Sequence, residues 1–90
     1  MKLSFPNPSR SFDESKNRVC FWGYDSAIEV SFFMEADALK RLCPDVSNVE
    51  EGILQAFDSK RQNIYDVADK VYRKSDKGSF SIILVANDFR

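Results

Sequence analysis

Few residues of this chain belong to the types that carry out acid–base, nucleophilic or metal chemistry. Histidine is absent from the 90 residues, which removes the commonest general base and the usual partner of a serine or cysteine nucleophile. Cys20 and Cys43 lie far apart in the sequence, and two thiolates without histidine make a poor zinc site. We therefore expect no catalytic residues, no metal site and no cofactor, and a protein that is not an enzyme.

Paired carboxylates and glycine-rich loops are the remaining signals of catalysis. Asp66 and Asp69 fall on the expected solvent face of a helix, and Asp13 and Glu14 adjoin an expected turn. Solvated charge explains both pairs better than general acid–base work does. The three glycines do not have the spacing of a phosphate-binding loop. Neither signal changes the expectation of a non-enzymatic protein.

A segment rich in hydrogen-bond donors lies near the start of the chain. It contains Asn7, Ser9, Arg10 and Ser11, so that a guanidinium stands between two hydroxyls. Such a loop could bind an anion or a peptide terminus. The alternative, which we favour, is a rigid lead-in whose side chains satisfy nearby backbone groups. These four residues are the candidate loop site.

Basic residues cluster in one place. Lys70, Arg73, Lys74 and Lys77 lie where a helix is expected to end, and cations there complement the helix dipole by about 0.3–1 kcal/mol each. We favour this explanation over a nucleic-acid contact. The formal net charge is −1, from 13 basic and 14 acidic residues, and nucleic-acid binders usually have a basic face.

Length and composition indicate one globular domain over residues 1–90, with an irregular N-terminal segment at 1–9. The 43 % hydrophobic content is ample for a core. No stretch resembles a secretory signal, and no apolar run approaches the roughly 18 residues of a membrane span. We therefore expect a cytoplasmic protein with reduced cysteines and no membrane contact.

The hydrophobic pattern predicts a two-layer α+β domain. Its period is two near both ends of the chain and 3.6 in the middle. The expected strands cover residues 11–14, 18–24, 27–34 and 80–86, and the expected helices cover 35–43 and 47–74. The first three strands form an antiparallel meander joined by the C-terminal strand, both helices cover one face, and the element order is β-β-β-α-α-β. The order of the strands in the sheet is left open.

The long helix has one irregular position. Lys60 falls in the middle of the apolar stripe, and Ser59 with Gln62 could cap a new helix there. We favour one continuous helix, because the stripe stays in phase on both sides of Lys60.

Both faces of the central hairpin carry large apolar side chains. A two-residue loop at Asp25-Ser26 would place Phe21 opposite Val30 and Trp22 opposite Glu29. A slip of one residue would mix the two faces, which period-two patterning disfavours. The helices are expected to cover the face formed by Val19, Phe21, Val30, Phe32, Phe80, Ile82 and Leu84.

The other face of the sheet is the main candidate interface. It carries Trp22, Tyr24, Phe33, Ile83 and Val85, together with Cys20. Monomers seldom expose apolar patches beyond several hundred Å², and aromatic residues are enriched in interface cores. Either the N-terminal segment covers this face with Leu3, Phe5 and Phe12, or another subunit does. We expect self-association, as a homodimer, or docking of a protein partner.

Several stretches resemble a known family. They are LSFPNPSRSFD at 3–13, VCFWGYDSAIEVSFF at 19–33, ADAL at 36–39, FDSKRQNI at 57–64, the step from Ala68 to Tyr72, and the closing Asn87-Asp88-Phe89. With these stretches the chain resembles the short bacterial proteins grouped as domain of unknown function 1488. The resemblance implies a small cytosolic α+β domain of proteobacterial type, and it supplies no activity and no catalytic residues.

The function expected from the sequence is therefore a non-enzymatic protein-interaction or accessory module that self-associates through the outer sheet face. One alternative is a regulatory nucleic-acid-binding protein that uses the basic end of the long helix. Another is a small anion or ligand binder that uses the Asn7–Ser11 loop. The sequence does not predict the identity of a partner or the biological role.

Overall fold

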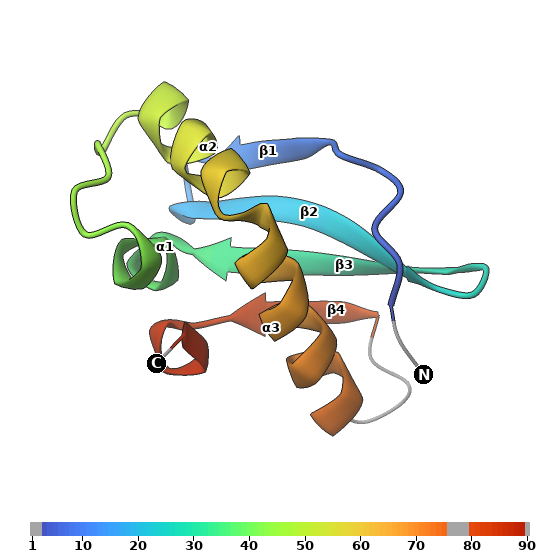
Figure 1. Ribbon diagram of the computed structural model, residues 1–90. Coiled ribbons are helices and arrows are strands. Elements are labelled where there is room, and N and C mark those ends of the chain that lie inside the picture. The colour runs from blue at the N-terminus through green and yellow to red at the C-terminus, as the bar shows by residue number, and fades with distance from the viewer. Residues whose placement is uncertain (1–2, 76–79, 90) are drawn as a thin grey trace.

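The computed structural model describes residues 3–75 and 80–89 and confirms the two-layer α+β class. The strands are β1 (Arg10–Asp13), β2 (Arg18–Asp25), β3 (Ile28–Glu35) and β4 (Ser81–Leu84); the helices are α1 (Ala36–Leu42), α2 (Glu50–Ser59), α3 (Arg61–Lys74) and the 3-10 helix η1 (Ala86–Phe89). All three α-helices lie on one side of the sheet, with α2 near β1 and α3 across β3 and β4 (Figure 1).

The sheet has the order β1-β2-β3-β4 and is mixed. The first three strands form the expected antiparallel meander. The last strand pairs parallel to β3, so the sheet is not antiparallel throughout. The three helices between β3 and β4 supply the long crossover that a parallel pair needs.

The register of the central hairpin differs from the predicted one by two residues. The turn is formed by Ser26 and Ala27, so Phe21 lies opposite Phe32 and Trp22 opposite Ser31. Ser26 adopts a φ of 58°, a conformation that sequence rules associate with glycine or asparagine. Because the shift is even, every side chain keeps its predicted face.

The continuous long helix is a wrong prediction. Lys60 has φ −119° and ψ 20°, so α2 ends before it and α3 begins after it. The break places Lys60 in solvent rather than against the sheet. The cap at Ser59, which belonged to the alternative of an interrupted helix, is absent as well, because the Ser59 hydroxyl donates to the carbonyl of Ala56 at 2.8 Å. The start of α2 at Glu50, rather than at 47, also differs from the prediction.

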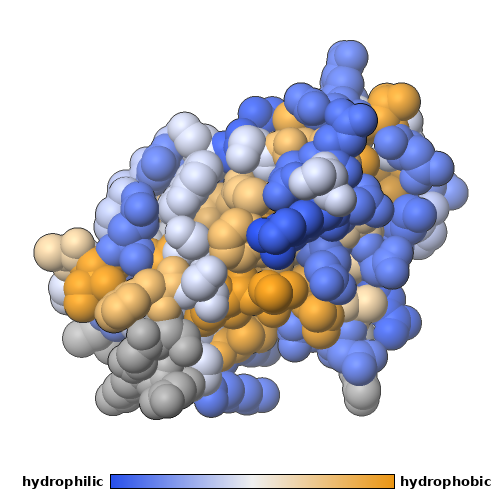
Figure 2. Space-filling model, turned by 180° about the vertical axis from the view of Figure 1, so that it is seen from behind, coloured by the Kyte–Doolittle hydropathy of each residue, from blue (hydrophilic) through white to orange (hydrophobic). Residues whose placement is uncertain are grey.

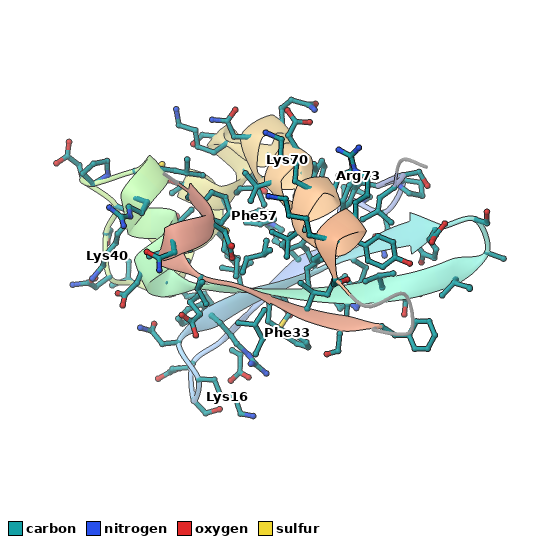
Figure 3. All side chains as sticks on the ribbon, turned by 90° about the horizontal axis from the view of Figure 1, so that it is seen from below. Lys16, Phe33, Lys40, Phe57, Lys70 and Arg73 are labelled. Atoms are coloured by element: carbon teal, nitrogen blue, oxygen red, sulfur yellow. The ribbon has the colours of Figure 1, made fainter. Side chains whose placement is uncertain are left out.

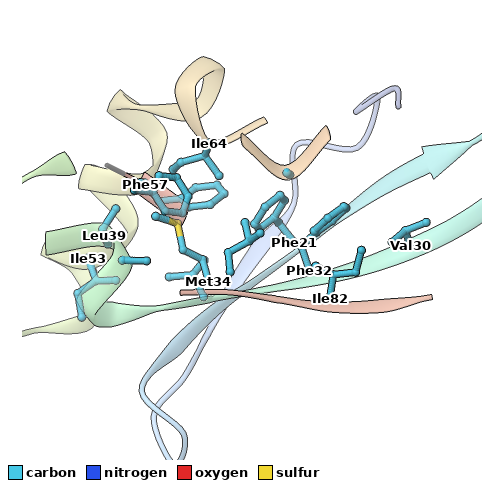
Figure 4. Packing of buried hydrophobic residues seen from close by; sticks show 14 of the residues in the cluster. Phe21, Val30, Phe32, Met34, Leu39, Ile53, Phe57, Ile64 and Ile82 are labelled. Carbon is cyan, nitrogen blue, oxygen red and sulfur yellow. The ribbon is translucent and has the colours of Figure 1, made fainter. Parts of the chain in front are cut away.

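The core lies between the helices and the inner face of the sheet (Figure 4). Phe21, 1 % exposed, is at its centre. Its ring centroid lies 5.2 Å from that of Phe32, 5.1 Å from Phe57 and 5.9 Å from Tyr65. Phe80 was predicted to join this face but is 55 % exposed, one residue before β4.

The N-terminal segment packs on the same inner side as the helices. The amide of Leu3 donates to the buried carboxylate of Asp69 at 2.9 Å. Phe5 stacks on Tyr65, with centroids 4.1 Å apart and an interplanar angle of 4°. Phe12 contacts the core as well. The segment therefore does not use these three side chains to cover the outer face.

Gly23 on β2 leaves room for the ring of Phe5 from the N-terminal segment. A Cβ atom at position 23 would lie 2.6 Å from the ring of Phe5, closer than a carbon contact allows. Beside it, Ser4 and Tyr24 exchange two backbone hydrogen bonds of 3.0 and 2.8 Å. The segment thus continues the sheet edge beyond β1.

Phe21→Ala should lower the free energy of unfolding by about 3–5 kcal/mol, because it removes the ring at the centre of the core. Chemical denaturation measures the change. The control is Phe80→Ala, which removes an exposed ring and should change the free energy by no more than about 0.5 kcal/mol. Equal losses in the two variants would show that Phe21 does not have this central role.

Candidate functional site

The outer face of the sheet gathers the predicted interface residues. Cys20, Phe33 and Ile83 are direct neighbours across β2, β3 and β4. Trp22 lies in the next row, beside the small side chain of Ser31. We call the surface formed by Cys20, Trp22, Phe33 and Ile83, with Tyr24 at one end, the outer face. Val85 was also predicted for it; this residue follows directly after β4 and is half-buried.

Much of this surface is apolar and accessible. Ile83 is 51 % exposed, and the other outer-face side chains are partly exposed. Figure 2, which views the molecule from this side, shows apolar atoms from the left edge across the lower middle of the face, with hydrophilic atoms mainly above and to the right. Within residues 3–75 and 80–89, the helices lie on the opposite side of the sheet.

Arg18 covers part of the patch. Its guanidinium carbon lies 4.1 Å from the ring centroid of Phe33, a cation–π contact that sequence reasoning missed. Its Nε is buried without a hydrogen-bond partner in the described part of the chain, and it is 3.9 Å from a carboxylate oxygen of Asp13. A hydrogen bond from the Ser15 hydroxyl, aided by backbone amides, lowers the pKa of Asp13 despite its desolvation. This end of the outer face is therefore charged.

At the opposite end of the outer face, a tyrosine side chain is hydrogen-bonded to a glutamate. The Tyr24 hydroxyl donates to the Glu29 carboxylate at 3.0 Å, and this bond raises the pKa of Tyr24. Between the two ends, burial raises the pKa of the Cys20 thiol. Burial thus disfavours the thiolate, which is the nucleophilic form of a cysteine.

The candidate loop site is tied into the fold. The Asn7 carboxamide oxygen accepts the amide of Ser9 at 3.0 Å. Arg10 donates two hydrogen bonds to Asp58, of 3.0 and 2.9 Å. Ser11 lies apart from this cluster, on β1 opposite Cys20. The guanidinium thus has an internal carboxylate partner, and anion binding at this loop remains a prediction.

A second arginine completes a cluster that sequence reasoning missed. Arg61 donates to Asp58 at 2.8 Å, to the carbonyl of Pro8 at 2.7 Å and to the hydroxyl of Tyr65 at 2.6 Å. Asp58 lies on α2 and Arg61 on α3, so the spacing rule for pairs on one helix does not account for this contact across the break at Lys60. Desolvation raises the pKa of Asp58, but the hydrogen bonds and charges of Arg10 and Arg61 outweigh it and lower the pKa.

The predicted basic patch is divided. Arg73 forms an ion pair with Asp69 at 3.0 Å. Lys70 and Lys74 border a groove instead, and Lys77 lies outside the described residues. Figure 3 shows Lys70 and Arg73 on the helical side of the molecule, opposite Phe33. A nucleic-acid contact through this patch remains a prediction.

The groove beside Lys70 and Lys74 has a volume of about 730 Å³. It lies between α3, the end of α1 and η1, and its lining includes Asp66 and Asp88. Sequence periodicity could not reveal it, because η1 and α1 are far apart in the chain.

Two further findings concern metals and membranes. Within the described ranges, no group of three or more cysteine, aspartate or glutamate side chains could hold a metal ion. None of the helices in the described part of the chain is long and apolar enough to cross a membrane.

Lowering the pH should weaken the Asp58 cluster. The folded-state pKa is depressed, so the stabilisation is full above the unfolded carboxyl pKa of about 3.9 and is lost as the pH falls below it. Asp58 is 40 % exposed, and water screens its ion pairs to roughly 0.5–1 kcal/mol. Asp58→Asn should therefore be less stable than wild type at neutral pH and equally stable in acid. Denaturation curves at several pH values test this; a pH-independent difference would contradict it.

Comparison with known proteins places the chain in a family. The family model described as "Protein of unknown function (DUF1488)" matches residues 3–84. The fold is similar to the crystal structure of a protein of unknown function from the DUF1488 family of Shewanella loihica PV-4, with 17 % identity, a TM-score of 0.74, and coverage of 89 % of this chain and 90 % of that chain. No curated protein gives a match. Because the family model spans most of its length, this chain belongs to the DUF1488 family of proteins of unknown function.

Proposed function

We propose that this protein is a non-enzymatic protein-interaction module that self-associates through its outer face. The observation that carries the proposal is an apolar sheet surface, centred on Trp22, Phe33 and Ile83, on the side away from the helices. Removing this surface from water would stabilise an assembly by roughly 25 cal/mol per Å² before the costs of association.

A second copy of the chain is the partner that fits best. Sheets pack face to face with their strands nearly aligned, about 10 Å apart. With a two-fold axis along the strands, between β2 and β3, Trp22 faces the small Ser31 of the second copy. Arg18 then faces Glu35 of the second copy, because these residues lie opposite each other in the register. In this proposed arrangement each copy would present the same residues to the other, as a two-fold interface requires.

The size of the face argues for a weak dimer. β2 and β3 have eight residues each and β1 and β4 four each, so at roughly 3.3 Å per residue and 4.8 Å per strand the projected area is about 380 Å². A standard interface buries about 800 Å² on each partner. Association is therefore expected in the micromolar range or weaker.

A cytoplasmic location is part of the proposal. Cys20 and Cys43 are both free, which agrees with a reducing compartment.

Trp22→Glu should dissociate the assembly and leave the fold intact, because it places a carboxylate in the centre of the outer face. Sedimentation velocity from low micromolar to millimolar concentration should give a dimer for wild type and a monomer for the variant. Far-ultraviolet circular dichroism should be the same for both.

Val49→Glu is the matched control. Val49 is 62 % exposed and lies at the start of α2, away from the outer face. This variant should dimerise like wild type. A wild-type protein that remains monomeric at millimolar concentration, or equal loss of association in both variants, would refute the proposal.

A further inference from the structure

The last strand of the sheet has an open edge. Among the described residues β4 pairs only with β3, and η1 follows at its C-terminal end (Figure 1). The Ser31 amide donates to the carbonyl of Phe80 at 2.9 Å, which turns the backbone groups of the even-numbered residues toward β3. In a parallel ladder every second residue of a strand bonds to the same neighbour. The backbone groups of Ser81 and Ile83, and of Val85 directly after the strand, therefore face the open edge.

The sequence at this edge favours pairing with further strands. Residues 80–86, FSIILVA, include no charged residue, no proline and no glycine. Accessible segments of this kind pair readily edge to edge, and natural sheets often protect them with lysine or proline. Phe80 is 55 % exposed and Ile83 is 51 % exposed. The short length of β4, four residues, is one protection of this edge.

The segment after β4 supplies a second protection. The Val85 amide donates to the Asp88 carboxylate at 2.9 Å, and the Asp88 amide donates to the carbonyl of Val85 at 2.9 Å. Both edge-facing groups of Val85 thus have partners in η1, where a further strand would otherwise pair. Phe89 is 6 % exposed and packs into the core, which holds η1 in place.

We propose that Asp88 is an edge cap, which occupies the pairing groups of Val85 and prevents β4 from pairing with β4 of a second copy. Two such strands, related by a two-fold axis perpendicular to the sheet, would pair antiparallel through identical apolar sequences. Freeing Val85 lengthens the edge available for pairing from two residues to three. This role is independent of the outer face, because sheets that pack face to face leave the edge of β4 free.

Asp88→Ala removes the carboxylate and frees the Val85 amide. Hydrogen exchange followed by NMR should show this amide exchanging roughly twofold to tenfold faster, as expected for the loss of one hydrogen bond. The variant should also form β-rich aggregates faster than wild type at the same concentration, measured by thioflavin fluorescence and light scattering. Asp88→Asn keeps an oxygen that can accept the Val85 amide and should behave like wild type.

Two further variants separate the cap from a general loss of stability. Ile53→Val removes one buried methylene in α2 and lowers stability without touching the edge. Compared at the same folded fraction, it should aggregate more slowly than Asp88→Ala. Ser81 is exposed on β4, so Ser81→Lys added to Asp88→Ala places a charge on the edge and should suppress the aggregation.

Three results would overturn this role of Asp88. The first is unchanged exchange of the Val85 amide in Asp88→Ala. The second is aggregation of Asp88→Asn or Ile53→Val as fast as that of Asp88→Ala at the same folded fraction. The third is aggregation that Ser81→Lys does not suppress, because it would then arise elsewhere in the chain.

Discussion

The packing of Phe21 against the rings of Phe32, Phe57 and Tyr65 is the interaction on which the rest of the structure depends. These rings come from β2, β3, α2 and α3, so one cluster joins both layers of the domain. Phe5 adds the N-terminal segment to the same cluster. The helices and the segment are therefore held on one side of the sheet.

This one-sided packing has a consequence for the other side. Trp22 and Phe33 alternate with core residues along β2 and β3, and a strand that buries Phe21 must turn Trp22 the opposite way. Within the described residues, the segments that could have covered the outer face are engaged in the core or with the helices. Arg18 shields Phe33 in part, and Ile83 remains half exposed. The accessible outer face thus follows from how the core is built.

Period-two alternation was sufficient to predict the two faces of the hairpin, and with them the residues of the candidate interface. It did not fix the register, because the turn uses Ser26 at positive φ, a position for which serine gives no signal. The parallel pairing of β4 depends on the path of the helices in space, which local patterns do not encode. Lys60 in the apolar stripe is a signal of the helix break, but the stripe stays in phase on both sides of it and therefore also fits one continuous helix.

The polar contacts were the least predictable part. Arg10 and Asp58 are 48 residues apart, and only the folded chain brings them together. The same holds for the amide of Leu3 and Asp69. The groove joins residues of α1, α3 and η1, and the sequence indicated its lysines only as a helix end. Sequence patterns thus predicted which faces are apolar. Only the structure shows which charged side chains have a partner and which residue that partner is.

Trp22 is the single tryptophan of the chain, so its fluorescence reports directly on the outer face. The decisive measurement is its emission maximum and its quenching by acrylamide as the protein concentration rises from low micromolar to millimolar. Self-association through the outer face predicts a shift of the emission to shorter wavelength and a loss of quenching as the concentration increases. An emission maximum and a quenching constant that stay the same over the whole range would contradict it.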